Sequence, residues 1–399
     1  MTHIETELIH AGKGFNETKA VSPPIFQTST YYASSDAEEY MVTATEPRHP
    51  TFYHRHGNPV SSQAAEVINK LEGTEATILT ATGMAAISTA VLSVLNAGDH
   101  VIAQQSHYSA ARTLLNEVLT DFGMSVTYVD QANPKAFEKA IRPETRLIYV
   151  ETPSNPSLVL TDLSHVAQLA KKHNLISICD NTFACPLNQQ PYLLGIDVVV
   201  HSATKYLGGH SDLTAGSVSG SVKFINKAWK KSLSLGGSLA PFDAWLLLRG
   251  MRTLALRVQQ INENAMQLAK WLQAHPAVHT VLYCGLPTHP QHDLAKKQMK
   301  GFGGMICVEL AGDTEEEQFQ RAQSVLNQFQ IFSNAASLGG VESLVVHPAS
   351  MWGMHHSKKQ KESAGINNGM LRISVGIEHI DDLIADFQQA LQASYKDIK

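Results

Sequence analysis

The sequence has little cysteine, no long apolar run and no excess of basic charge. Only four of its 399 residues are cysteine, and none forms a CxxC pair, so neither a disulfide framework nor a zinc knuckle is expected. No stretch approaches the roughly 18 consecutive apolar residues of a membrane span. The N-terminus lacks the basic and apolar regions of a secretory signal. We therefore expect a cytoplasmic protein that does not enter a membrane.

The charge balance argues against nucleic acid as a partner. Lys plus Arg number 31 and Asp plus Glu number 36, a net charge of −5, whereas binding to a phosphate backbone needs a clustered excess of Lys and Arg. Hydrophobic residues make up 43% of the chain, which is typical of globular proteins. The length favours two or three domains.

Histidine is the residue type in unusual abundance, with 19 copies. They are spread along the chain without an HExxH motif or another ligand spacing, so no metal site is predicted. The pair His355-His356 lies in a polar, lysine-rich segment and is expected to be solvated.

Strand and helix patterns alternate from about residue 61 onward. Short apolar stretches such as 100–104, 147–150 and 176–179 are expected to be strands, and amphipathic stretches between them are expected to be helices. This alternation predicts βαβ units and an α/β fold with a mostly parallel sheet.

Three segments are expected along the chain. Residues 1–60 show little periodicity, so we expect an N-terminal arm that reaches the neighbouring subunit. Residues 61–255 are expected to form the large sheet domain, and residues 256–399 a smaller α+β domain. A single long helix over 243–274 is expected to connect them.

Two apolar stretches each end in an ionisable residue. ISICD ends at Asp180, and VVHSATK ends 25 residues later at Lys205. Functional residues of parallel sheets lie just beyond the carboxyl ends of strands, so both should face one crevice. A lysine that forms a Schiff base and an aspartate that pairs with a pyridine nitrogen are what pyridoxal phosphate (PLP) requires. A structural ion pair is the alternative.

A second cluster could bind a phosphate group. Gly83 and Met84 follow an expected strand and begin an expected helix, where backbone N–H groups form an anion site. A plain strand-to-helix turn is the alternative. Ser202 and Thr204 flank the candidate lysine and offer hydroxyls to the same phosphate, or serve as ordinary turn residues.

Three further side chains have two interpretations each. Arg55 could bind phosphate through two hydrogen bonds, or remain a solvated surface charge. Tyr108 follows a strand and could stack on a planar ring, or simply pack against the core. Arg372 lies within an apolar strand, where a guanidinium needs a partner. A substrate carboxylate or an internal salt bridge could supply that partner.

Taken together, these motifs resemble those of the Cys/Met-metabolism family of PLP enzymes, which includes cystathionine γ-lyase, cystathionine γ-synthase, methionine γ-lyase and cystathionine β-lyase. The resemblance extends over nearly the whole chain. The matching stretches are YHRHGNP (53–59), ATGMAAI (81–87), ETPSNP (151–156), CDNTFACP (179–186), HSATKYLGGHSD (201–212), SLGGVESLVVHPASM (337–351) and LRISVGIE (371–378).

The resemblance implies the PLP-dependent transferase fold type I, with a large mixed, mostly parallel sheet domain and a smaller α+β C-terminal domain. It implies PLP as the cofactor, a small amino acid as the substrate and a homotetramer built as a dimer of dimers.

Roles follow for the residues that match the family's motifs. Lys205 resembles the Schiff-base lysine that also moves protons, Asp180 the partner of the pyridine nitrogen, and Tyr108 the ring-stacking catalytic tyrosine. The other residues implied to contact the cofactor are Tyr53, Arg55, Gly83, Met84, Asn155, Thr182, Ser202 and Thr204, with Tyr53 and Arg55 reaching the neighbouring subunit's phosphate. The residues implied to bind substrate are Ser337, Leu338 and Arg372.

Several positions depart from the family's usual pattern. Cystathionine γ-lyases and γ-synthases commonly carry glutamates where this chain has Phe52 and Ala336, so a distal amino group loses its partners. Bacterial methionine γ-lyases usually carry a cysteine at the position of Ala110. His54 replaces a usual serine, and Trp352 stands where a small residue is common.

The apolar Phe52 and Ala336 favour α,γ-elimination from a sulfur amino acid, as in methionine γ-lyase, giving a 2-oxo acid, ammonia and a thiol. The alternatives are a cystathionine γ- or β-lyase, or a γ-replacement enzyme such as cystathionine γ-synthase or O-acylhomoserine sulfhydrylase.

Overall fold

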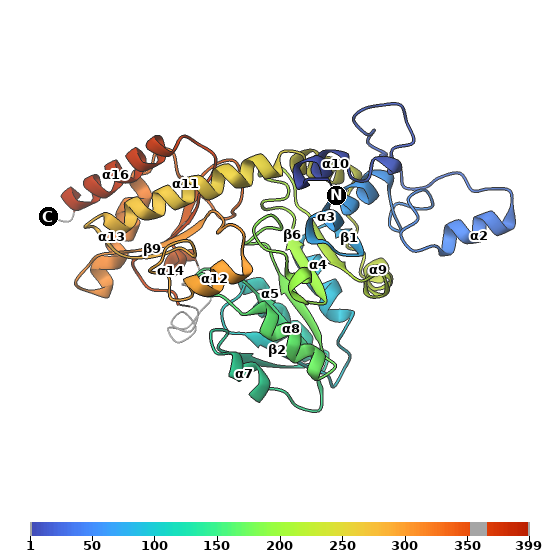
Figure 1. Ribbon diagram of the computed structural model, residues 1–399, viewed down its shortest axis with the longest axis horizontal. Helices are drawn as coiled ribbons and strands as arrows, with labels where there is room; N and C mark the ends of the chain where they lie inside the picture. Colours follow the sequence, from blue (N-terminus) through green and yellow to red (C-terminus); the bar gives the residue numbers. More distant parts are fainter. Residues whose placement is uncertain (1, 352–364, 398–399) are drawn as a thin grey trace.

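The computed structural model describes residues 2–351 and 365–397. Trp352, His355 and His356, which the sequence singled out, lie outside the described residues. A large sheet occupies the middle of the molecule and a smaller sheet lies beside it, toward the C-terminus (Figure 1). None of the helices in these two ranges is long and apolar enough to cross a membrane.

The large sheet confirms the expected α/β fold. Its strand order is β1-β7-β6-β5-β4-β2-β3. Neighbours from β6 to β3 are parallel, whereas β7 runs antiparallel to both β1 and β6. The strands are β1 (Ala76–Thr80), β2 (His100–Gln104), β3 (Ser125–Val129), β4 (Thr145–Glu151), β5 (Ile176–Asp180), β6 (Val198–Ser202) and β7 (Gly216–Gly220).

Helices cover both faces of this sheet, which explains why most of its strands are buried along nearly their whole length. Ile178 packs with α4 and α9 on one face, whereas its neighbour Cys179 packs with α7 and α8 on the other. The helices of this domain are α3 (Pro59–Glu72), α4 (Gly83–Leu92), α5 (Ser109–Thr113), a π-helical turn (Leu114–Val118), α6 (Leu119–Asp121), α7 (Pro134–Lys139), α8 (Leu163–Lys172), α9 (Val222–Leu235) and α10 (Pro241–Met251).

The small sheet has the order β10-β11-β12-β9-β8. Its core joins β9 and β12 to the helices α11, α13 and α16. The strands are β8 (Val278–Leu282), β9 (Met305–Leu310), β10 (Ser333–Asn334), β11 (Leu344–Val346) and β12 (Met370–Ser374). The helices are α11 (Leu254–Ala274), α12 (His292–Gln298), α13 (Glu315–Gln328), α14 (Pro348–Met351) and α16 (Ile380–Asp397).

The single long helix expected over 243–274 is wrong, because the chain breaks it into α10 and α11. A Cβ on Gly250 would lie 2.2 Å from the carbonyl oxygen of Gly208, so α10 ends against another backbone. Arg257 of α11 then donates to the freed carbonyl oxygen of Gly250 at 2.8 Å. The periodicity of both helices is similar, so the sequence alone concealed the break.

Strand β7 was also missed. Its sequence GSVSG looks like a turn, yet all five residues are buried. Small residues are required because the backbone of β7 approaches that of the β1–α4 connection. A Cβ on Gly216 would lie 2.2 Å from the carbonyl oxygen of Thr82.

The N-terminal segment combines a packed part and a projecting part. Leu8 of α1 (Ile4–His10) is 1% exposed and packs with α3. In contrast, α2 (Ala37–Thr45) has no buried residue and projects from the body (Figure 1). The expected limits at residues 60 and 255 fall at the first turns of α3 and α11, and the division into three segments stays a prediction.

Replacing Leu8 with Ala tests the packing of α1. The change removes buried methyl groups, so the free energy of unfolding is expected to fall by about 2–5 kcal/mol. Urea denaturation followed by circular dichroism measures it. Ile9→Ala is the matched control on the same helix, because Ile9 is 48% exposed. Equal losses in the two variants would contradict the packed position of Leu8.

Candidate active site

A cavity of about 340 Å³ lies where the carboxyl ends of β4, β5 and β6 face β12 of the small sheet. It brings together every site residue expected from the sequence except the two arm residues. Those lining it are Gly83, Met84, Tyr108, Asn155, Asp180, Thr182, Ser202, Thr204, Lys205, Ser337, Leu338 and Arg372.

Asp180 ends β5 and has one carboxylate oxygen fixed by Thr182. The hydroxyl of Thr182 donates to Asp180 Oδ1 at 2.5 Å and its amide donates to the same atom at 3.0 Å. Thr182 Oγ1 accepts the amide of Ser202 at 2.9 Å, which joins β5 to β6. Burial raises the pKa of the Asp180 carboxyl, and the two hydrogen bonds from Thr182 oppose that shift.

Lys205 reaches across to the small domain. Its Nζ donates to the hydroxyl of Ser337 at 2.8 Å. Burial, followed by the nearby charge of Arg372, lowers the pKa of Lys205 to about 8. The neutral, nucleophilic amine is therefore far more accessible than in an exposed lysine.

Arg372 lies within β12 and is 5% exposed. Its guanidinium donates to Asn155 Oδ1 at 3.0 Å and to the carbonyl oxygen of Ser337 at 3.1 Å. Among the described residues, no ion pair joins it to a carboxylate, so the internal salt bridge considered from the sequence is absent there. The remaining donors can bind an incoming carboxylate.

Sequence reasoning missed Glu151, a second buried carboxyl in the cavity. It ends β4, is 3% exposed, and its Oε2 accepts the amide of Tyr108 at 2.7 Å. Burial, and then the charge of Asp180, raises the pKa of Glu151 well above its usual range. Its position at the end of a strand, like that of Asp180, was the signal that could have identified it.

The start of α4 forms an anion cradle opposite Lys205. The side chain of Thr82 caps the helix by accepting the amide of Ala85 at 3.0 Å, and the first-turn amides of Gly83 and Met84 have no acceptor within the helix. A Cβ on Gly83 would lie 2.7 Å from Cβ of Ser202. Glycine thus lets the helix start approach the hydroxyl of Ser202 closely.

The hydroxyl of Thr204 forms its hydrogen bonds with the backbone of Ala215. Its hydroxyl donates to the carbonyl oxygen of Ala215 at 3.2 Å and accepts the amide of Ala215 at 3.0 Å. Its proton is therefore already used within the loop, although its side chain lines the cavity.

These groups fit PLP by the chemistry of their donors and acceptors. The start of α4 suits a phosphate. Asp180 Oδ2, which makes no hydrogen bond with the described residues, can accept from a protonated ring nitrogen. Lys205 supplies the amine for the aldehyde, and Tyr108, 42% exposed, lines the same cavity.

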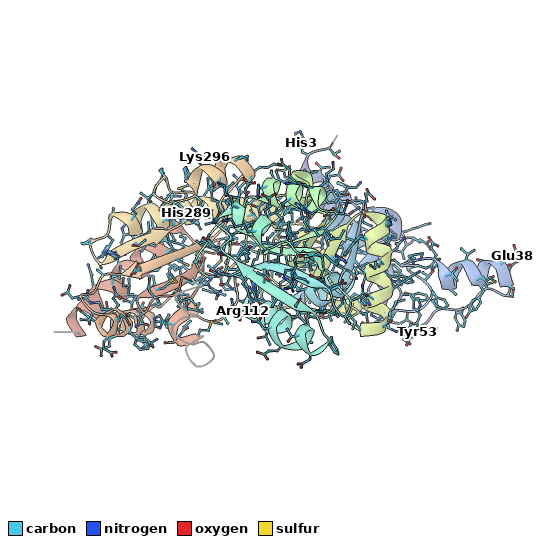
Figure 2. All side chains as sticks on the ribbon, turned by 90° about the horizontal axis from the view of Figure 1, so that it is seen from below. His3, Glu38, Tyr53, Arg112, His289 and Lys296 are labelled. Carbon is cyan, nitrogen blue, oxygen red and sulfur yellow. The ribbon has the colours of Figure 1, made fainter. Side chains whose placement is uncertain are left out.

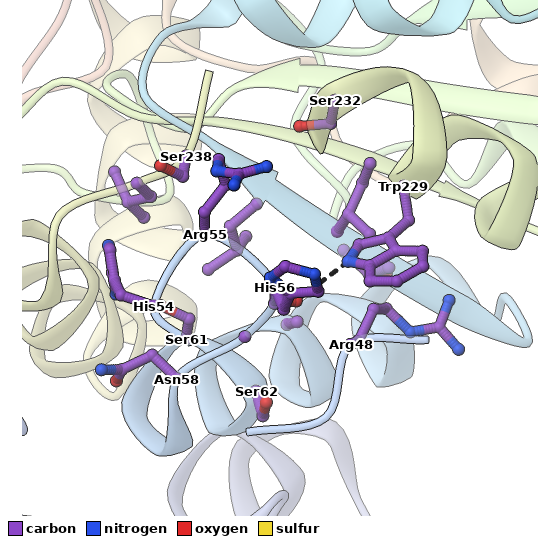
Figure 3. Close-up of a pocket in the computed structure, with 16 residues that line it drawn as sticks. Arg48, His54, Arg55, His56, Asn58, Ser61, Ser62, Trp229, Ser232 and Ser238 are labelled. Carbon is purple, nitrogen blue, oxygen red and sulfur yellow. Dashed lines mark hydrogen bonds between the residues drawn. The ribbon is translucent and has the colours of Figure 1, made fainter. Parts of the chain in front are cut away.

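The arm residues do not reach this cavity within one protomer. Arg55 donates to the carbonyl oxygen of Leu233 at 3.2 Å and lines a separate cavity of about 70 Å³ with His54 and Trp229 (Figure 3). Tyr53 lies on the arm side of the molecule (Figure 2). Their expected contact with a phosphate is therefore not made within one protomer and stays a prediction.

No metal site accompanies these groups. In residues 2–351 and 365–397, no group of three or more His, Cys, Asp or Glu side chains could hold a metal ion. The buried His100, for example, hydrogen-bonds to the hydroxyls of Thr145 and Thr127.

Comparison with known proteins shows which proteins the chain is similar to. The chain is 42% identical over 390 residues to a cystathionine gamma-lyase of Bacillus subtilis (strain 168), with 97% of this chain and 99% of the relative covered. It is 41% identical over 396 residues to an L-methionine gamma-lyase of Fusobacterium nucleatum subsp. polymorphum, with 98% of each covered. The crystal structure of cystathionine gamma-lyase from Lactobacillus plantarum complexed with L-serine is 39% identical, with a TM-score of 0.91 over 99% of this chain and 100% of that chain.

The sequence profile described as Cys/Met metabolism PLP-dependent enzyme matches residues 5–392. This match agrees with the cavity, its amine and its anion cradle. The chain therefore belongs to the Cys/Met-metabolism family of PLP-dependent enzymes.

Proposed function

We propose that this PLP-dependent lyase acts by α,γ-elimination on a methionine- or homocysteine-like amino acid, giving a 2-oxo acid, ammonia and a thiol. The observation that carries the proposal is the apolar wall of the cavity. Ala336, Leu338 and Met351 line it, and a thioether side chain suits such a wall.

The two carboxyl groups of the cavity already accept hydrogen bonds from neighbouring residues. Of its lining residues, Glu151 and Asp180 carry carboxyl groups. Glu151 accepts from the amide of Tyr108, and Asp180 is fixed by Thr182. Within the described part of one protomer, neither is placed at the wall to pair with a distal ammonium group, which argues against cystathionine as the preferred substrate.

The roles of the residues follow from their positions. When bound, PLP supplies an aldehyde and a ring that delocalises electrons from the substrate Cα–H bond. Asp180 accepts the ring N–H, and Arg372 binds the substrate carboxylate through its unused donors. Lys205 Nζ accepts and returns protons because its neutral form is accessible near pH 8.

Other cofactor contacts are proposed on the same basis. Gly83, Met84 and Ser202 bind the phosphate at the start of α4, and Tyr108 stacks on the ring. Ser337 orients Lys205 through the hydrogen bond at 2.8 Å.

The comparisons leave the substrate open. Relatives named cystathionine gamma-lyase and cystathionine beta-lyase are both 42% identical to this chain, and one named L-methionine gamma-lyase is 41% identical. Identity alone therefore does not separate the candidate reactions, and the wall at Ala336 becomes the point to test.

The substrate prediction is tested by measuring products. Methionine and homocysteine are expected to give 2-oxobutanoate with a higher kcat/KM than cystathionine, with no requirement for an added thiol. Ala336→Glu is expected to raise the cystathionine-to-methionine ratio of kcat/KM by about 10- to 100-fold, the effect of a hydrogen bond to a charged group. Ala336→Gln is the neutral control. Pyruvate from cystathionine as the main product, or turnover only with an added thiol, would refute the proposal.

The pH dependence of Lys205 gives a second test. An amine attacks an aldehyde only when it is neutral, and the pKa of Lys205 is lowered from 10.5 to about 8. The rate of PLP rebinding to the apoprotein, followed by absorption, is therefore expected to rise with pH and level off above about 8. Because the charge of Arg372 contributes to the shift, Arg372→Gln is expected to move the midpoint upward. A wild-type midpoint near 10.5 would contradict the burial of the amine.

We also propose that the arm completes the site of a second subunit in a homotetramer built as a dimer of dimers, because Tyr53 and Arg55 lie outside the cavity of their own protomer. An Arg55→Ala protein and a Lys205→Ala protein mixed in equal amounts are then expected to form hybrids as about half of their dimers. Each hybrid has one intact site of two, so about a quarter of the wild-type sites are restored. Each variant alone and unmixed serves as the control. If verified hybrids stay inactive, Arg55 serves its own subunit.

A further inference from the structure

A buried acid–imidazole pair lies directly behind the candidate site. Glu72, at the end of α3, is 0% exposed, and His201 of β6 is 1% exposed. The distance from His201 Nε2 to Glu72 Oε1 is 2.5 Å. Neither residue lines the cavity, and neither has a role in the proposed reaction.

The pair is connected to the site through the strands. His201 precedes Ser202, and Asn181 follows Asp180. Because successive side chains of a strand point to opposite faces, His201 points to the far side of the sheet from Ser202. On that side, the side-chain amide of Asn181 donates to the same oxygen, Glu72 Oε1, at 3.0 Å.

Glu72 depends on His201 for its charge balance. Its second oxygen is buried without a hydrogen-bond partner, and no Lys or Arg forms an ion pair with it in the described part of the chain. A buried carboxylate requires a proton or a cation nearby. The imidazole of His201, whose Nε2 lies 2.5 Å from Glu72 Oε1, is the group placed to supply that charge.

A positive charge on His201 would also act on Asp180. The charge of His201 favours ionised Asp180 and opposes the effect of burial on that carboxyl. The other ionisable groups around the pair are the thiols of Cys179 and Cys185, whose pKa values burial raises. Both thiols stay neutral. Of the positive groups near them, Arg257 acts on Cys185, whereas His201 acts on Asp180.

We propose that Glu72 and His201 are positioning residues of the active site. They hold a proton behind the sheet, and this proton keeps Asp180 ionised as the acceptor for the ring nitrogen of PLP. The inference rests on the proposed role of Asp180 and adds a purpose for two residues that touch neither cofactor nor substrate.

Loss of the charge on His201 is expected to shift the pH midpoint of the cofactor's absorption in one direction. Without the charge of His201, Asp180 takes up a proton more readily and no longer retains a positive charge on the ring nitrogen. That positive charge normally repels the proton on Lys205 Nζ when the cofactor is bound. Its loss therefore moves the pH midpoint of the cofactor's visible absorption upward.

The experiment compares His201→Gln and Glu72→Gln in the PLP-loaded enzyme. Both are expected to raise the absorption midpoint by about one pH unit, within the range that a nearby charge produces, and to raise the Kd of PLP about tenfold. Glu72→Gln is nearly isosteric, so it keeps the test informative if His201→Gln folds poorly.

His100→Gln is the matched control. His100 is also fully buried and makes two hydrogen bonds, to Thr145 and Thr127, but it is the first residue of β2 and so lies at the opposite end of the strands from the cavity. We expect this variant to lose stability without moving the absorption midpoint. If His201→Gln and Glu72→Gln move the midpoint no more than His100→Gln does, the inference is overturned.

Asp180→Asn separates the two proposals. An upward shift in Asp180→Asn together with no shift in Glu72→Gln refutes the role of the pair and preserves that of Asp180. No shift in Asp180→Asn refutes the proposed role of Asp180 itself, and the inference with it.

Discussion

Two carboxyl groups and two basic side chains share one cavity, and in the described part of the chain no ion pair joins any two of them. Lys205, Arg372, Asp180 and Glu151 are instead held by hydrogen bonds to hydroxyl, amide and carbonyl groups. Burying charges without pairing them is unfavourable. In the proposed function, this unpaired capacity serves a charged cofactor and a zwitterionic substrate.

Two sheets supply these groups, and each has a distinct contribution. The parallel strands of the large sheet end at one edge, which puts Glu151, Asp180 and Ser202 side by side. The small sheet contributes Arg372 from β12. Ser337, in the loop between β10 and β11, contacts both Lys205 and Arg372. The cavity therefore depends on how the two sheets pack as much as on any one motif.

The sequence predicted best those residues whose position follows from local periodicity. Asp180 and Lys205 were found because they follow apolar strands, and strand ends gather at one edge. Glu151 was missed although it too ends an apolar strand, because its contact with the backbone amide of Tyr108 leaves no pattern that distinguishes it from other strand ends. Strand β7 was missed because close backbone approach selects glycine and serine, which otherwise indicate turns. Within its own protomer Arg55 donates to the carbonyl oxygen of Leu233, and the contact with a second chain that the sequence suggested stays a prediction.

The four cysteines have a consequence for the proposed chemistry. All four are free and buried, and burial raises the pKa of each thiol. Thiol–disulfide exchange needs an accessible thiolate. An enzyme that releases a small thiol at every turnover is exposed to that thiol and to its oxidised disulfide. If the proposed elimination releases such a thiol, the protonated thiols in the core of this chain are poorly placed to attack the oxidised disulfide of that product.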